Sequence, residues 1–323
     1  MTVERPLTVD SAGYRLAGTL ALPDGPGPHP AALLLPSFGA TDRDGDLRHL
    51  PLGIQRQLAA ALAGAGIASL RYDRRGVGGS TGEFLRTGFH DNVDDAAAVF
   101  AALRADPAVN GGRLFLVGHG EGALTSIALA ARGVPVAGLV LLAAPGRTGA
   151  EGARWQAARL VPTLPAPVRL LLRLYRTDPV AKVSRSHERI LATTGDVARI
   201  DGQRLNARWF REFLRYDPRP DLARVHAPIL ALTGDKDIQT DPQDLPVLAA
   251  HAGGPAQIGV LPEVTHVLRR QPGPPSMRAY RDEAKRPLDP SVVRPVVSWL
   301  AAHRAERTRD GDGRPRRTGR LPG

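Results

Sequence analysis

Three short segments carry residue types that could perform acid–base or acyl chemistry. The run Gly118-His119-Gly120-Glu121-Gly122 follows the apolar stretch 113–118 and precedes an apolar helical pattern. Asp237 follows another apolar stretch, and His266 follows the last one. A histidine oriented by a carboxylate can act as a general base, and a strand–turn–helix with glycines around its centre can present a nucleophile. The centre of this turn, however, is Gly120, which has no side chain.

Apolar runs alternating with helical patterns must position these segments. We expect strands at 14–20, 31–36, 67–72, 113–118, 138–144, 228–233 and 257–261, and helices at 54–65, 91–105, 121–132, 242–251 and 290–303. The middle strands are continuously apolar, which is typical of strands buried on both faces of a mainly parallel sheet. The pattern therefore predicts an α/β fold with helices on both faces of the sheet.

The alternation stops between Pro145 and about His226. That region holds helical stretches at about 150–160, 166–176 and 203–215, rich in Leu and Arg, with no strand-like run between them. Because the sheet pattern resumes directly afterwards, we expect a helical cap inserted between two core strands; a separate small helical domain is the alternative. The predicted organisation is a first core part at 1–145, a cap at 146–226, a second core part at 227–305 and a disordered basic tail at 306–323.

Four further blocks accompany the turn at Gly120. They are Pro36-Ser37-Phe38-Gly39 followed by Asp42-Arg43-Asp44-Gly45, Asp73-Arg74-Arg75-Gly76-Val77-Gly78-Gly79-Ser80, Gly234-Asp235-Lys236-Asp237, and Val264-Thr265-His266. With the turn, they resemble the α/β-hydrolase superfamily, and within it the bacterial esterases and S33-peptidase-like hydrolases, whose turn usually reads G-H-S-E-G. The resemblance covers about residues 14–303. It implies an α/β-hydrolase fold with a triad in the order nucleophile, acid, histidine.

The resemblance also assigns roles to single residues. The expected site consists of His266, Asp237, Gly120 as the vacant nucleophile position, and Phe38 and Glu121 as backbone N–H donors of an oxyanion hole. Asp237 is favoured over Asp235 because the family's acid lies three residues after the glycine. Asp235 is then a turn residue.

Two departures from the family pattern bear on mechanism. Gly120 cannot form an acyl intermediate, so we expect covalent serine chemistry at this position to be lost. The loop at 36–39 reads P-S-F-G where the family commonly has H-G-x-G. Ser37 is a remote alternative nucleophile, whereas Thr125 and Ser126 are expected on the helix after the turn, too deep to attack.

Three functions remain open on this basis. The dyad and the oxyanion hole could activate water for ester or acyl hydrolysis, or transfer protons in a lyase or cyclase reaction. Alternatively, the chain is a catalytically silent binder of a small molecule or a protein. The cap is expected to define a pocket for a small molecule, and its Arg excess hints at an acidic ligand unless those side chains are simply solvated.

Composition excludes cysteine chemistry and indicates where the protein is located. The chain of 323 residues has no Cys, which excludes disulfides, thiolate metal sites and a cysteine nucleophile. The start MTVERPLTVD lacks a signal-peptide pattern, and no apolar run is long enough for a membrane span, so a cytoplasmic location and no membrane partner are expected.

The net charge of +11 does not indicate a nucleic-acid partner. Its excess lies in 146–226, with sixteen basic residues against eight acidic ones, and in 303–323, with seven against three. No nucleic-acid-binding motif accompanies it. The runs 76–81 and 42–46 resemble a dinucleotide loop and a calcium loop, but both lack the required spacing, so no cofactor and no metal are predicted. Nothing in the sequence defines an oligomeric state.

Overall fold

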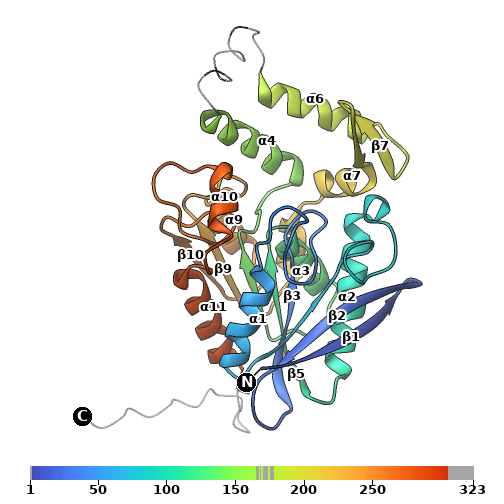
Figure 1. Cartoon of the computed structure of the whole chain (residues 1–323), viewed down its shortest axis with the longest axis vertical. Helices are drawn as coiled ribbons and strands as arrows, with labels where there is room; N and C mark the ends of the chain where they lie inside the picture. The colour runs from blue at the N-terminus through green and yellow to red at the C-terminus, as the bar shows by residue number, and fades with distance from the viewer. Residues whose placement is uncertain (1, 165–166, 168, 170–173, 175–177, 305–323) are drawn as a thin grey trace.

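The computed structural model describes residues 2–304 except 165–166, 168, 170–173 and 175–177 (Figure 1). The core sheet has the strand order β1-β2-β4-β3-β5-β6-β9-β10. These strands are β1 (Val3–Ser11), β2 (Tyr14–Leu22), β3 (His29–Leu35), β4 (Ala68–Tyr72), β5 (Val109–His119), β6 (Gly138–Leu142), β9 (Ile229–Gly234) and β10 (Ala256–Leu261). From β4 to β10 all neighbours are parallel, while β1 and β2 are added antiparallel. The predicted α/β-hydrolase fold is confirmed.

The edge strand β1 was not predicted. It carries charged residues and Pro6, and most of its side chains are exposed, so it lacks the apolar run that identified the other strands. Its inner end contributes Val9 and Ser11 to the protein interior. A turn at Ala12 and Gly13, both with positive φ, folds it back onto β2.

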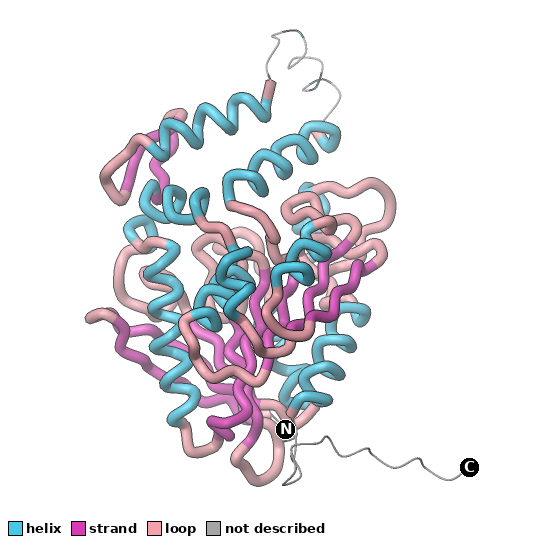
Figure 2. Tube along the Cα trace, turned by 180° about the vertical axis from the view of Figure 1, so that it is seen from behind, coloured by secondary structure: helices cyan, strands magenta, loops and turns pink. Residues whose placement is uncertain are grey.

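Two apolar clusters lie on opposite faces of the sheet, and the two views show helices on both sides (Figures 1 and 2). One cluster joins the sheet to α2 (Phe89–Ala105), α3 (Glu121–Ala131), α8 (Pro218–Arg224) and α9 (Asp244–His251). The other joins it to α1 (Ile54–Gly64), α10 (Tyr280–Glu283) and α11 (Pro290–His303). This double burial explains why the central strands are apolar throughout, and it fixes the carboxyl ends of β3, β5, β9 and β10 at one edge of the sheet.

The inserted region stands over that edge (Figure 1). It contains α4 (Gly149–Leu160), α6 (Pro179–Leu191), β7 (Val197–Ile200), β8 (Gln203–Asn206) and α7 (Ala207–Arg215), with a small apolar cluster of Ile190, Ile200 and Leu214. Short 3₁₀ turns occur at η1 (Phe84–Arg86), η2 (Val161–Thr163) and η3 (Met277–Ala279). The helix α7 packs against α2, and α8 packs against α3 and α9 of the core.

The expectation of an uninterrupted helical cap was wrong. The strands β7 and β8 form a hairpin, so the helix predicted from 203 begins only at Ala207. Asp201 and Gly202 both have positive φ in the connecting turn, and Asp-Gly is a strong hairpin signal that helical periodicity outweighed. The helix α6 was not predicted, the stretch predicted at 166–176 falls mostly on residues outside the described ones, and so does the tail at 306–323. Within the described part of the chain, no helix has the length and apolar character needed to cross a bilayer.

Candidate active site

The turn between β5 and α3 has the geometry of a nucleophile elbow. Gly120 has φ +55° and ψ −114°, a conformation that residues with a side chain rarely adopt. Its two neighbouring glycines are needed for close packing, since a Cβ on Gly118 would overlap the backbone of Gly122, and a Cβ on Gly122 would overlap the carbonyl of Leu35. The sequence pattern is therefore realised as a sharp strand–turn–helix whose centre lies at the top of the sheet.

His266 and Asp237 are brought together beside this turn. His266 Nδ1 lies 2.9 Å from Asp237 Oδ2. The other carboxylate oxygen, Oδ1, accepts the backbone N–H groups of Gln239 and Thr240, each at 2.8 Å. The carboxylate is buried and held on both sides, so it fixes the imidazole with Nε2 directed away from it. Asp235 is exposed and accepts the backbone N–H of Glu263 at 2.6 Å, a turn contact away from the imidazole.

The space above Gly120 is occupied by a hydroxyl. A Cβ placed on Gly120 would lie closer to Ser37 Oγ than the 3.0 Å below which such contacts are essentially never seen, 3.2 Å from Ser37 Cβ and 3.4 Å from His266 Nε2. Ser37 Oγ itself lies 3.4 Å from His266 Nε2. The expected vacancy at the nucleophile position is thus corrected: the loop after β3 fills it.

Ser37 had a signal in the sequence that was underrated. In the run P-S-F-G, serine stands where the pattern H-G-x-G has its first glycine. The side chain of a residue at that position needs space, and the Ser37 side chain occupies the space left by the missing side chain of Gly120. Ser126, by contrast, lies within α3 and donates to the carbonyl of Gly122 at 2.8 Å, and Thr125 is also buried there, as expected.

Two backbone N–H groups, on the residues that follow Ser37 and Gly120, lack a hydrogen-bond partner within the described part of the chain. Among the described residues, neither the N–H of Phe38 nor that of Glu121 makes a hydrogen bond within the chain. Glu121 is the first residue of α3, where N–H groups are unpaired and the helix dipole is positive. Both N–H groups are therefore left without an acceptor within the described part of the chain.

A buried ion pair joins the Ser37 loop to the elbow helix. Arg74 donates to the carbonyls of Pro36 and Ser37, both at 3.1 Å, and to Glu121 Oε2 at 2.9 Å. Glu121 Oε1 accepts from Asn92 at 3.0 Å. Arg74 is only 5% exposed and Glu121 only 4%, so the pair is shielded from water and can hold the loop in one position. Sequence reasoning had credited Glu121 only with its backbone N–H.

The cap is tied to the same network. Trp209 of α7 donates its indole N–H to Glu121 Oε1 at 2.9 Å. Asn206 caps α7 and donates to the carbonyls of Phe84 at 2.8 Å and Thr87 at 2.7 Å. The cap and the turn at Gly120 are therefore connected by hydrogen bonds as well as by apolar packing.

A second imidazole supports the first. His119 Nε2 donates to the backbone carbonyl of His266 at 2.8 Å, and the two rings lie 4.8 Å apart. Burial, with a smaller effect of the neighbouring His266, lowers the pKa of His119 to about 3. His119 is therefore neutral near pH 7 and acts as a hydrogen-bond donor that positions the His266 loop.

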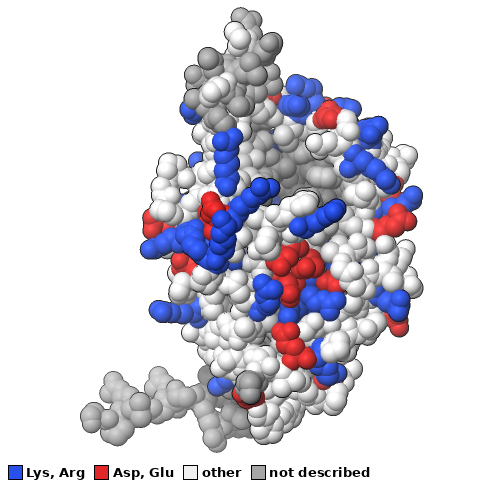
Figure 3. All heavy atoms as spheres, viewed as in Figure 1, with Lys and Arg blue, Asp and Glu red and all other residues white. Residues whose placement is uncertain are grey.

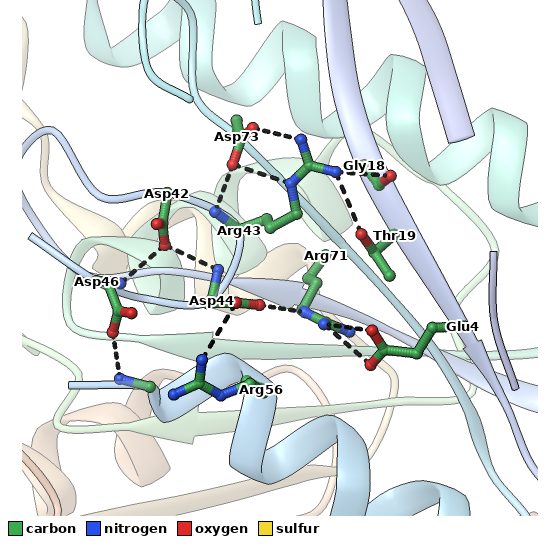
Figure 4. Close-up of polar contacts among 11 residues, drawn as sticks. Glu4, Gly18, Thr19, Asp42, Arg43, Asp44, Asp46, Arg56, Arg71 and Asp73 are labelled. Atoms are coloured by element: carbon green, nitrogen blue, oxygen red, sulfur yellow. Dashed lines mark hydrogen bonds and ion pairs between the residues drawn. The ribbon is translucent and has the colours of Figure 1, made fainter. Parts of the chain in front are cut away.

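The acidic loop after Ser37 is an anchor (Figure 4). Asp42 Oδ1 accepts the backbone N–H groups of Asp44 and Asp46, and Arg43 pairs with Asp73 at 2.6 Å. Asp44 pairs with Arg71 of β4 at 2.8 Å. One carboxylate of the loop, Asp44, and one arginine of the loop, Arg43, therefore form ion pairs that fasten the loop to β4 and to the segment after it.

A cavity of about 720 Å³ lies between the core and the cap. Its floor includes Ser37, Gly120 and His266. The apolar side chains that the cap contributes include those of Leu160, Val161, Val183, Phe210 and Phe213. No Lys or Arg belongs to the described lining, and on the face drawn in Figure 3 basic and acidic side chains are interspersed. Among the described residues, the lining of the cavity thus carries none of the basic side chains of the cap.

Fold and site together define an α/β hydrolase. The family described as "Serine aminopeptidase, S33" matches residues 52–272, more than half of the chain, and the chain belongs to that family. Esterase EstD of Thermotoga maritima is 29% identical over 144 residues, which cover 45% of this chain and 33% of the esterase. The match thus spans only about a third of that relative's length.

Solved structures share the fold over nearly the whole chain. Est1E from Butyrivibrio proteoclasticus, solved with ferulic acid, has a TM-score of 0.60 at 17% identity and covers 92% of this chain and 99% of its own. GrgF from Penicillium sp. sh18 has a TM-score of 0.61 at 18% identity, covering 94% and 99%. A proline iminopeptidase of Mycobacterium smegmatis reaches 0.62 at 16% identity, covering 93% and 98%. At these identities the likeness shows the fold alone.

Proposed function

We propose that this chain hydrolyses esters, or closely related acyl compounds, of a small molecule whose apolar part binds beneath the cap. The observation that carries the proposal is the His266–Asp237 pair at 2.9 Å, with Nε2 of the imidazole turned toward the cavity floor and toward the Ser37 hydroxyl. The similarity to Esterase EstD supports the same chemical class.

Each group has a role that follows from its position. Asp237 holds His266 in the tautomer whose Nε2 is free to accept a proton, and it stabilises the imidazolium that forms. His266 removes the proton of the attacking hydroxyl and later returns it to the leaving group. The N–H groups of Phe38 and Glu121 stabilise the negative charge that develops on the substrate carbonyl.

The cavity suggests the kind of substrate. Its apolar cap and the absence of Lys or Arg from the described lining favour a neutral ester over a phosphorylated or carboxylated one. Phe38 is 51% exposed and packs against Trp209 with the two rings tilted and their centroids 4.6 Å apart. Aromatic and aliphatic acyl groups are both compatible with such a surface.

Hydrolysis of 4-nitrophenyl acetate, butyrate and octanoate tests the proposal. We expect kcat/KM to rise with acyl length while the cavity accepts the chain, and to fall by at least about 10³-fold in His266→Ala. His251 is exposed at the end of α9, away from the cavity lining, so His251→Ala is the matched control and should behave as the wild type.

Two results would contradict the proposal. One is a His266→Ala variant that hydrolyses these esters as fast as the wild type. The other is a folded wild-type protein that turns over none of them and no thioester or amide analogue; a protein that bound such compounds unchanged would then act as a binder, and one that rearranged them as a lyase or cyclase.

A further inference from the structure

We propose that Ser37, on the loop after β3, supplies the nucleophile that the elbow lacks. The inference deepens the proposed acyl hydrolysis and rests on it. The alternative is a direct attack by water, with Ser37 only contacting the imidazole.

Ser37 Oγ lies where the hydroxyl of an elbow serine would lie. A serine side chain at residue 120 would begin at a Cβ that overlaps Ser37 Oγ and lies 3.4 Å from His266 Nε2. Ser37 Oγ therefore lies within the volume that an elbow serine would occupy, although it enters from the opposite segment of the chain. The hydroxyl lines the cavity floor, so a bound ester can reach it.

Ser37 is also placed to be activated by His266. Within the described chain, Ser37 Oγ has a single hydrogen-bond partner, His266 Nε2 at 3.4 Å. The imidazole is backed by Asp237, which gives the sequence of hydroxyl, base and carboxylate that activates a serine. The distance is long for a hydrogen bond, as is common before substrate tightens such contacts.

The expected donors of the oxyanion hole also suit a nucleophile on Ser37. In an ordinary elbow one donor is the N–H of the residue after the nucleophile, and the other comes from the loop after β3. Here Phe38 follows Ser37 directly, and Glu121 lies across the site on the elbow. A nucleophile on Ser37 would therefore use the same two residues, Phe38 and Glu121, because Phe38 follows Ser37 and Glu121 follows Gly120, whose missing side chain Ser37 replaces.

Hydrogen bonds also hold the backbone of Ser37 in place. The carbonyl of Ser37 accepts from Arg74 at 3.1 Å and from Thr41 Oγ1 at 3.2 Å. Arg74 is itself fixed by Glu121 of the elbow helix. The segment that carries the hydroxyl is therefore clamped to the element that carries the empty elbow, so its hydroxyl is held in place for reaction.

The reaction balances as an acyl transfer in two steps. Ser37 Oγ bonds to the carbonyl carbon while its proton passes to His266 Nε2; the ester C–O bond then breaks and His266 protonates the leaving alcohol. Water next attacks the acyl-Ser37 ester, gives its proton to His266, and Ser37 leaves with that proton as the carboxylic acid departs.

Paraoxon, diethyl 4-nitrophenyl phosphate, is the probe for the proposed nucleophile. We expect wild-type protein to release one nitrophenolate per chain and to gain one diethylphosphoryl group on the peptide that contains Ser37. Ser37→Ala should gain none and should lose at least about 10³-fold in kcat/KM on nitrophenyl butyrate. Ser298 is exposed on α11, so Ser298→Ala is the control and should match the wild type in both respects.

The outcomes separate this inference from the proposed function. A folded Ser37→Ala protein that keeps its turnover while His266→Ala loses it would overturn the nucleophile and leave the hydrolase standing. Labelling on any residue other than Ser37, or no labelling of an active wild type, would also overturn the nucleophile. A wild type without turnover that is nevertheless phosphorylated at Ser37 would overturn the proposed substrate class and support the nucleophile.

Discussion

Placing a serine at position 120 should destabilise the protein, and part of that loss should disappear when Ser37 is removed at the same time. The backbone of Gly120, at φ +55°, is strained for any residue with a side chain, at about 1–3 kcal/mol. The new Cβ would also overlap Ser37 Oγ and lie 3.2 Å from Ser37 Cβ, and such overpacking costs about 1–3 kcal/mol. We therefore expect Gly120→Ser to lower the free energy of unfolding by about 2–6 kcal/mol.

The second of these terms depends on Ser37. In the double variant Ser37→Gly/Gly120→Ser the overlap is absent, so the two substitutions should couple favourably by about 1–3 kcal/mol. The double variant also carries the hydroxyl at the elbow, beside His266 and between the same N–H donors. Its kcat/KM on nitrophenyl butyrate should exceed that of Gly120→Ser alone by at least about tenfold, or about 1.4 kcal/mol in transition-state stabilisation.

Urea unfolding of the four proteins in the cycle measures the coupling, and ester hydrolysis measures the catalytic part. Gly133→Ser is the matched control, since Gly133 also has positive φ, at +85°, but nothing lies within 4 Å of a Cβ placed there. Its effect should add to that of Ser37→Gly without coupling. Additive effects of Ser37→Gly and Gly120→Ser on both stability and activity would refute the claim that the two side chains compete for one space.

Three further expectations concern the groups around the site. Asp237→Asn should keep the fold but lower kcat by about 10⁴-fold, because an amide can hold the imidazole in the wrong tautomer. Steady-state kinetics measure this loss, with circular dichroism as the control for folding. Undiminished turnover would show that Asp237 is not the acid that orients His266. Arg74→Met should cost about 3–5 kcal/mol of stability because it leaves the Glu121 carboxylate buried without its cation, whereas Arg132→Met, which breaks an exposed pair with Asp94, should cost about 1 kcal/mol or less; equal losses in urea unfolding would contradict the role of Arg74. Burial lowers the pKa of His119 from its ordinary value of about 6.5 to about 3. Between these two pH values the unfolded chain binds a proton at His119 and the folded chain does not. The free energy of unfolding therefore falls as the pH falls through that window, by about 1.4 kcal/mol per pH unit at most. The difference in unfolding free energy between the wild type and His119→Gln should therefore depend on pH below about 6.5, and a difference that is constant from pH 7 to pH 5 would show that His119 is not buried in its neutral form.

The strands and helices of the core could be predicted because their burial leaves a pattern in the sequence. Strands such as β6 and β9 are covered on both faces and are apolar without interruption, so the periodicity is unambiguous. The edge strand β1 has no such run, since one of its edges faces solvent and most of its side chains are exposed. In the cap, the hairpin of β7 and β8 is short and half-exposed, and its Asp201-Gly202 turn was the one local signal for it.

The site could be predicted only as far as motifs reach. Gly120, Asp237 and His266 are implied by motifs that resemble those of the α/β hydrolases, and the structure brings all three to one end of the sheet. The serine in P-S-F-G singles out Ser37, but no local pattern shows that its side chain enters the space left by Gly120, 83 positions later in the chain. The roles of Arg74 and of the Glu121 side chain depend on a contact between two loops, which the sequence does not encode as a local pattern.

Mass measurement of the protein quenched in acid during turnover of nitrophenyl butyrate shows whether Ser37 becomes acylated. We expect a fraction of chains heavier by one butyryl group, carried on the peptide that contains Ser37, and no such species in Ser37→Ala or His266→Ala. Hydrolysis that proceeds at full rate with no acylated chain at the earliest quench times, and with Ser37→Ala equally active, would contradict this expectation.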